Sequence, residues 1–368
     1  LNQISDLYEE HKKASDPDKK KDIYRKIDEL SQEASQYAIA NEYDKAISSL
    51  GASGTNAHTW FDETVYKNNI PNNELEKWLK IEKERFSELV LRLFHTELES
   101  VYEEFNRAQD NDSRLVQYEL MDALFPNHPN GQQTTLGKAE HLKNPSMKAI
   151  HKYFDEYYVP NNYAMVLVGD LDFGDTIKLV DQYFGTIPYR ELPEKASVTE
   201  KPITEIIERT VKSPTTPRVQ LAWRTESYGT KEAILADIVA NILSNRGEAG
   251  LIDLNINQTQ KLLWGQAFSV GLKQYGYFSI VAVPKETQTL DEAKKLVLEQ
   301  VELVKKGEFP DWMLTAIIND FKVQRMKALE TADGLATNLY DTYIKGRTWE
   351  QELNEMNEYE AITKEEVV

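Results

Sequence analysis

The order of predicted helices and strands is the feature that most restricts the fold of this chain. Apolar runs and alternating patterns predict strands at residues 55–66, 163–168, 218–224, 265–273 and 276–283. Most of the segments between them have the apolar spacing of helices, which we expect near residues 75–86, 97–108, 113–124, 146–158, 175–184, 231–243, 251–258, 290–305 and 310–331. The helices do not alternate one-for-one with the strands, which argues against a doubly wound parallel sheet. The sequence therefore predicts an α+β fold with two similar domains, each a mainly antiparallel sheet packed against helices.

Changes in pattern divide the chain into four segments. Residues 1–50 predict a helical hairpin whose two helices meet at Ser15-Asp16-Pro17-Asp18, because proline suits the first turn of a helix. Its exposed faces are rich in Lys and Glu, which is typical of a solvated helix pair without chemistry of its own. Residues 51–190 form the first predicted domain, residues 191–202 a charged linker, and residues 203–368 the second domain.

The composition excludes several classes of function. The 368 residues suit two domains of about 150 residues each. Acidic residues outnumber basic ones 61 to 43, and the net charge of -18 opposes binding to nucleic-acid phosphates. The absence of cysteine excludes disulfides and thiol catalysis, and it is compatible with either the periplasm or the cytoplasm. No apolar run approaches the ~18 residues of a membrane span, and no segment has the pattern of a signal peptide.

The two ends of the sequence suggest a piece of a longer protein. Leu1 already lies within a helical pattern. At the other end, Thr363 and Glu366 have the spacing of a capping box, which marks the start of a helix. The sequence stops at Val368, directly after this start. We therefore expect that residues 1–368 are internal to a longer chain.

Two glutamates on one predicted helix form the most distinctive arrangement of candidate ligands. Glu97 and Glu104 are seven residues apart, so both side chains lie on one face of the helix, two turns apart. Beside the apolar stripe of Leu98 and Val101, such carboxylates can reach a cation in a cleft. Glutamates at this spacing are also typical of a solvated helix face. The spacing alone does not distinguish these interpretations.

The histidines do not complete a metal site by their spacing. None of the six lies three or four positions from another, so no helix turn offers paired imidazoles. His58 lies in a predicted strand, and His128 lies in a predicted turn. His95 precedes Glu97 by two positions, a spacing that points the two side chains in different directions.

Several short motifs in a fixed order resemble one peptidase family. They are Asn56-Ala57-His58-Thr59 with Asp62, Thr64 and Tyr66, the pair Glu97 and Glu104, His128-Pro129-x-Gly131 with Gly137, Tyr157-Tyr158-x-Pro160-Asn161-Asn162, and Val168-Gly169-Asp170. In this order and spacing they resemble the insulinase/pitrilysin family of zinc metallopeptidases. The resemblance is strong over residues 51–190. Residues 203–368 match the family's second, structurally similar domain more moderately, and residues 1–50 match only as a lengthened insertion.

The resemblance implies a zinc site and a peptide-binding strand. Glu104 matches the family's distal zinc ligand, and Glu97 matches a supporting acidic residue of the catalytic site. The strand Asn56-Ala57-His58-Thr59 resembles the sheet edge to which the substrate peptide adds as a further strand. The family's inverted His-x-x-Glu-His helix supplies two zinc ligands and the general base. This helix is absent from the sequence, and we expect it upstream of Leu1.

The resemblance also implies a function for the intact protein. We expect a zinc-dependent endopeptidase that cleaves peptides bound as an added β-strand, with the chain as given inactive alone. The expected partners are a peptide substrate and a second family half, from the same longer chain or from another subunit. The alternative is a non-catalytic family member that acts as a binding or assembly subunit. An upstream His-x-x-Glu-His in the complete protein distinguishes the two.

Overall fold

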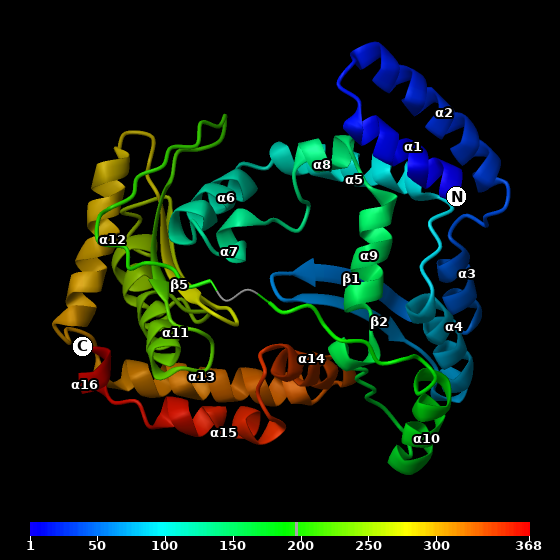
Figure 1. Cartoon of the computed structure of the whole chain (residues 1–368). Coiled ribbons are helices and arrows are strands. Elements are labelled where there is room, and N and C mark those ends of the chain that lie inside the picture. The colour runs from blue at the N-terminus through cyan, green and yellow to red at the C-terminus, as the bar shows by residue number, and fades with distance from the viewer. Residues whose placement is uncertain (196–197) are drawn as a thin grey trace. The chain divides into compact units, whose positions relative to one another are not determined.

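The computed structural model describes residues 1–195 and 198–368, which divide into two compact units (Figure 1). Unit 1 comprises Leu1–Tyr118 and Asn127–Lys201, and unit 2 comprises Glu119–Pro126 and Pro202–Val368. The chain therefore first enters unit 2 within helix α6 (Asp112–Leu124). The predicted linker 191–202 includes residues 196 and 197, which lie outside the described part of the chain.

Unit 1 combines helices with a β-hairpin. Its helices are α1 (Asn2–Lys13), α2 (Pro17–Ser35), α3 (Glu42–Ser49), α4 (Leu75–Ser87), α5 (Phe94–Gln109), α7 (Pro129–Gln132), α8 (Ala139–Lys143), α9 (Met147–Tyr157) and α10 (Phe173–Phe184), with 3₁₀ turns at Asn72–Glu74 and Pro160–Asn162. Strands β1 (Ser53–Trp60) and β2 (Glu63–Asn69) pair in antiparallel fashion. The prediction of one strand over residues 55–66 was wrong, because Phe61 and Asp62 form a two-residue turn within it.

Helices α1 and α2 form the predicted helical hairpin. The Asp16 side chain accepts a hydrogen bond from the Asp18 amide and Pro17 occupies the first turn, so α2 begins at the predicted position. The hairpin has a small core with other parts of unit 1. This core consists of Ile4, Tyr8, Ile23, Ile27 and Met147 of α9, with Leu91, Phe94 and Leu98 from the region of α5 packed against it.

Residues 163–168 do not form the buried strand that their apolar sequence predicts. The segment has no regular secondary structure, and its residues are half-buried or exposed. A strand requires a hydrogen-bonded neighbour. In the described residues the sheet of unit 1 contains β1 and β2, and neither pairs with this segment. The apolar pattern is therefore insufficient here to fix the structure.

Unit 2 is built on a three-stranded antiparallel sheet. Strands β3 (Val219–Thr225), β4 (Trp264–Gly271) and β5 (Gly276–Val283) lie in the order β3-β5-β4. Its further helices are α11 (Lys231–Leu243), a π-helical turn (Asp253–Asn257), α12 (Leu290–Lys305), α13 (Asp311–Leu329), α14 (Ala332–Ile344), α15 (Trp349–Glu360) and α16 (Lys364–Val367). Buried side chains of α11, α12 and the sheet, such as Ile238, Val297 and Ile280, form one core.

The three strands of unit 2 and helices α11, α12 and α13 agree with the sequence prediction, whereas α14 and α15 are not among the predicted elements. Small antiparallel sheets accompanied by helices in both units confirm the predicted α+β fold class. Over residues 1–195 and 198–368, none of the helices combines the length and the apolar character needed to cross a membrane.

Candidate functional site

Helix α5 carries the two glutamates singled out by their spacing. Its residues Phe94 and Leu98 pack against the core of the α1–α2 hairpin, whereas Glu97 and Glu104 are exposed. The two carboxylates share one side of the helix, because seven residues are close to two full turns. Their roles as zinc ligand and supporting acidic residue stay predictions.

The described residues do not bring a complete set of metal ligands together. Within residues 1–195 and 198–368, no group of three or more His, Cys, Asp or Glu side chains is placed to hold a metal ion. His95 of α5 is buried, and its Nδ1 atom is 2.7 Å from Tyr8 Oη. A catalytic zinc ion requires about three protein ligands and a water. Glu104 therefore fits zinc only as one member of a larger set.

Strand β1 is exposed along its whole length and pairs on one side with β2. The two-residue turn makes Trp60 and Glu63 a hydrogen-bonded pair, so alternate residues of β1 direct their backbone groups away from β2. Ala57 belongs to this outward set, and its amide donates to the Asn56 side chain, with an N···Oδ1 distance of 2.8 Å. The backbone groups of Ala57 and Thr59 therefore face the open side of the strand.

Two side-chain contacts between β1 and β2 accompany the backbone pairing of the hairpin. His58 Nε2 lies 2.8 Å from Glu63 Oε1, and Thr59 Oγ1 lies 3.4 Å from Thr64 Oγ1. Asn56, Ala57, His58 and Thr59 thus lie in one continuous exposed strand.

An ionic and aromatic cluster around the buried Glu82 supports β2. The Arg85 guanidinium of α4 is 4.3 Å from the ring centre of Tyr43 and 4.4 Å from that of Tyr66. Glu82 Oε2 is 2.9 Å from Arg85, and the Tyr43 hydroxyl donates to Glu82 Oε1 at 2.7 Å. Burial raises the pKa of the Glu82 carboxyl, and burial with the Glu82 contact raises the pKa of Tyr43 to about 12. Sequence reasoning missed this cluster, because its members come from three separate elements.

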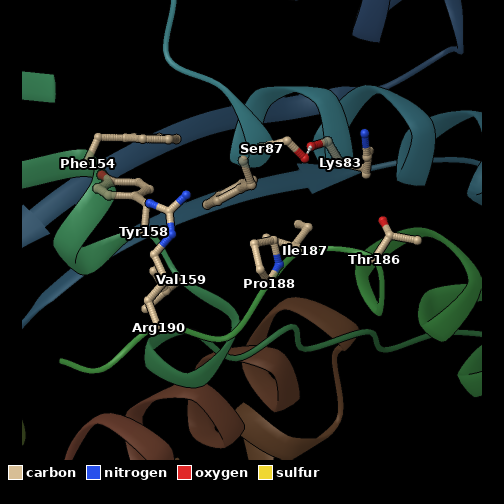
Figure 2. Close-up of a pocket in the computed structure, with 10 residues that line it drawn as sticks. Lys83, Ser87, Phe154, Tyr158, Val159, Thr186, Ile187, Pro188 and Arg190 are labelled. Atoms are coloured by element: carbon tan, nitrogen blue, oxygen red, sulfur yellow. Dashed lines mark hydrogen bonds between the residues drawn. The ribbon is translucent and has the colours of Figure 1, made fainter.

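A cavity of about 190 Å³ lies in the same region of unit 1, and Figure 2 shows its wall. It is lined by Lys83, Phe86, Ser87, Phe154, Tyr158, Val159, Thr186, Ile187, Pro188 and Arg190. The Tyr158 hydroxyl is hydrogen-bonded to that of Tyr66 at 2.8 Å, and burial raises the pKa of Tyr158. Arg190 donates to the Asp155 carbonyl and carboxylate at 2.9 and 3.2 Å. The predicted site residues are not among the lining residues, so the cavity is separate from the candidate site.

The segment that begins at His128 has a structural explanation. His128 Nδ1 accepts a hydrogen bond from the Asn130 amide at 3.1 Å, and Pro129 occupies the first turn of α7. His128 therefore caps a short helix. This agrees with the predicted turn at His128.

Two models of one peptidase family match consecutive parts of the chain. The model described as insulinase (peptidase family M16) matches residues 27–137. The model described as the peptidase M16 inactive domain matches residues 146–321. Together the two matches extend over most of the sequence.

Two curated proteins with a similar sequence are named as zinc proteases. The zinc protease PqqE of Helicobacter pylori is 23% identical over 336 residues, which are 88% of this chain and 74% of that protein. The probable zinc protease PqqL of Escherichia coli is 24% identical over 144 residues, which are 38% of this chain and 15% of that protein.

Solved structures share the fold of the chain. A protease from Helicobacter pylori matches with a TM-score of 0.74 and 20% identity, covering 89% of this chain and 80% of that one. The periplasmic protease PqqL from Escherichia coli matches with a TM-score of 0.72 and 17% identity, covering 89% and 38%. Pitrilysin matches with a TM-score of 0.65 and 18% identity, covering 88% and 36%.

At 20% identity or less, the similarity to the solved structures shows the fold alone, whereas the matches to the two family models show membership of the family. The motif order read from the sequence, the two consecutive family matches and the shared fold agree with one another. The chain belongs to the insulinase/pitrilysin family, peptidase family M16.

Proposed function

We propose that this chain is part of a zinc-dependent endopeptidase and that it holds the peptide substrate as an added strand along β1. The open edge of β1 is the observation that carries the proposal. Ala57 and Thr59 direct backbone donors and acceptors away from β2, on a strand whose residues are all exposed. An extended peptide satisfies such groups through its own backbone, so it binds with little demand on its sequence.

When no peptide is bound, the Asn56 side chain satisfies one of the outward-facing amides of this edge. An exposed edge strand invites pairing with other chains, and proteins usually blunt it with charge or proline. From Thr55 to Phe61 the sequence has no Pro, Lys, Arg, Asp or Glu. Instead, Asn56 Oδ1 accepts the Ala57 N–H. A peptide carbonyl that replaces Oδ1 exchanges one hydrogen bond for another, so the exchange costs little free energy.

The glutamates of α5 form this chain's share of the proposed metal chemistry. Glu104 is proposed as a zinc ligand and Glu97 as the supporting acidic residue, from their place in the order of motifs, and the names of the similar zinc proteases support zinc as the metal. One carboxylate does not make a zinc site. The remaining ligands and the general base are therefore assigned to a His-x-x-Glu-His helix outside residues 1–368, and the chain alone is expected to be inactive.

The second candidate is a non-catalytic binding or assembly subunit. The description of the family model over residues 146–321 as an inactive domain is compatible with both candidates, since the model described as insulinase matches residues 27–137 of the same chain. A complete protein that contains His-x-x-Glu-His and retains zinc through purification supports the peptidase. A complete protein without the motif supports the subunit.

Substitutions at Ala57 test the strand-addition proposal in the complete protein. Ala57→Pro removes the amide that a peptide carbonyl would bind and touches no proposed metal ligand. We expect at least a ten-fold loss of peptide affinity and of kcat/KM, with zinc content unchanged. Ala57→Val is the matched control, because it keeps the amide and suits a strand.

The readouts separate binding from folding. Circular dichroism and zinc analysis establish that Ala57→Pro is folded and metal-loaded, and fluorescence anisotropy with a labelled unstructured peptide measures affinity. A folded Ala57→Pro protein that binds and cleaves peptides like Ala57→Val would show that the substrate does not pair with β1.

A further inference from the structure

The start of helix α5 is held by the N-terminal hairpin. Phe94 and Leu98 pack against the hairpin core, and the rings of Tyr8 and Phe94 meet edge to face with centroids 5.3 Å apart. Helix α2 also contacts α5, and α1 contacts α9. The hairpin is therefore joined to the glutamate-bearing helix and to a second helix of unit 1.

A buried polar pair lies at the centre of this contact. Tyr8 is 1% exposed and His95 is 8% exposed, and Tyr8 Oη is 2.7 Å from His95 Nδ1. On the other side of the ring, His95 Nε2 lies 3.7 Å from Asp28 Oδ1 of α2. The carboxylate favours a proton on Nε2, which leaves Nδ1 to accept from the Tyr8 hydroxyl. The ring orientation is thus fixed from both helices of the hairpin.

The geometry of a helix relates this pair to the glutamates. At 100° per residue, Glu97 lies about 200° and Glu104 about 180° around the axis from His95. The glutamates are exposed, whereas His95 is buried against the hairpin. A rotation of α5 that loosened the Tyr8–His95 contact would turn both carboxylates by the same angle.

The hairpin is itself anchored elsewhere in unit 1. Lys20 Nζ donates to Asn144 Oδ1 at 2.7 Å, Lys148 Nζ lies 2.7 Å from Asp6 Oδ1, and Ser146 donates to the Glu9 carboxylate. These contacts join α1 and α2 to the segment between α8 and the first turn of α9. The hairpin therefore bridges two helices and is suited to fix one relative to the other.

We propose that the α1–α2 hairpin is a positioning element, and that the Tyr8–His95 hydrogen bond sets the direction in which Glu97 and Glu104 face. Tyr8 and His95 are positioning residues and do not contact substrate. The functional value of this direction rests on the proposed role of Glu104. The orientation of α5 is measurable without that role, so the two claims can fail separately.

The absence of cysteine allows a direct measurement of this orientation. Ser100→Cys on the exposed side of α5 and Ser49→Cys on α3 introduce two spin-label sites by near-isosteric changes at exposed positions. Electron–electron double resonance then gives the distribution of distances between the labels. Tyr8→Phe removes the hydroxyl alone, and we expect a broader or shifted distribution.

Matched variants separate positioning from general packing. Tyr24→Phe removes another tyrosine hydroxyl, on a ring whose centroid is 5.2 Å from that of His95, and should leave the distribution unchanged. His95→Asn places an oxygen near the position of Nδ1 and should keep the distribution narrow, whereas His95→Leu should broaden it. The proposal would be overturned if Tyr8→Phe and His95→Leu lowered the Tm but left the distribution of label distances unchanged. That result would show that Tyr8 and His95 only contribute to packing.

The zinc affinity of the complete protein tests separately whether Glu104 binds zinc. If Glu104 binds zinc, Tyr8→Phe should weaken zinc binding by about 10–100-fold, as changes behind a metal ligand typically do. A broadened label distribution with unchanged zinc affinity would support positioning by the hairpin and contradict the role of Glu104.

Discussion

At the residue scale, helix α5 exposes some of its charged and polar side chains to solvent and buries others. Glu97 and Glu104 are exposed, and His95, only two positions before Glu97, is buried against Tyr8. The spacing in the sequence predicts this separation, because side chains two positions apart on a helix point in different directions. It does not predict the Tyr8 contact, since the two residues are 87 positions apart.

Replacing the two glutamates separately in the complete protein tests their assigned roles. Glu104→Gln should abolish zinc retention, because a neutral amide is a much poorer ligand than a carboxylate. Glu97→Gln should reduce zinc affinity or turnover by only about 10–100-fold. Metal analysis after gel filtration and peptide-cleavage rates provide the measurements. Wild-type zinc content and activity in both variants would remove α5 from the site.

A pH dependence is expected from His11 at the end of α1. Burial, followed by the nearby Lys20, lowers the pKa of His11, and its Nδ1 has no hydrogen-bond partner among the described residues. Because the unfolded value is about 6.5, the unfolded chain binds the proton more readily. Stability from neutral His11 is therefore present above pH 6.5 and is lost as the pH falls through the lower folded-state pKa.

Calorimetry at pH 7 and pH 5 measures this effect. His11→Leu should show a smaller fall in Tm between the two values than the wild-type chain does. His141 has a side chain that is 70% exposed, so His141→Leu serves as the control and should behave like wild type. Equal falls in Tm for all three proteins would exclude His11 as the source.

At the element scale, the sequence predicts the helices with strong apolar spacing, and it fails where structure depends on partners or short turns. Helices α4, α5, α12 and α13 lie where their apolar stripes predict. The segment 163–168 has the right apolar sequence for a strand, but it lacks a neighbouring strand in the described residues. Apolar content signals burial, and only a partner supplies the hydrogen bonds of a sheet.

The helices that the sequence analysis missed, α14 and α15, are capped clearly. Thr331 accepts from the Gly334 amide, and Thr348 forms a capping box with Gln351. These caps are the signal that could have located both helices. Helix α15 contacts α13 through both ionic and ring contacts: Arg325 of α13 contacts Glu352 and Glu355, and the ring of Tyr359 packs against that of Phe321.

The ionic contact between α13 and α15 gives a prediction for unit 2. Arg325 lies 3.5 Å from Glu352 Oε1 and 3.4 Å from Glu355 Oε2, with all three side chains at most 14% exposed. Arg325→Met leaves buried carboxylates with less opposing charge, and we expect a loss of about 3 kcal/mol in the free energy of unfolding. The control Lys305→Met removes an exposed ion pair with Glu302 and should cost at most about 1 kcal/mol. Urea unfolding followed by circular dichroism would contradict the prediction if both variants lost the same amount.

At the scale of the whole molecule, motif order was more informative than any single residue. The fold class and the family are confirmed by the sheets, the helices and the two consecutive family matches. The sequence predicts only part of the candidate metal site. A metal site combines side chains from distant segments, and residues 1–368 supply one proposed zinc ligand. The open edge of β1 is different, since a single strand provides all the groups that a peptide backbone needs.

Amide hydrogen exchange along β1 tests the central claim most directly. An unstructured peptide that contains lysine is a suitable probe, because the net charge of -18 favours its encounter with the chain. If the peptide adds to β1, exchange at the Ala57 and Thr59 amides should slow on binding. The His58 amide, directed towards β2, should change little and serves as the internal control. A peptide that binds while the Ala57 and Thr59 amides exchange as fast as before would contradict the account.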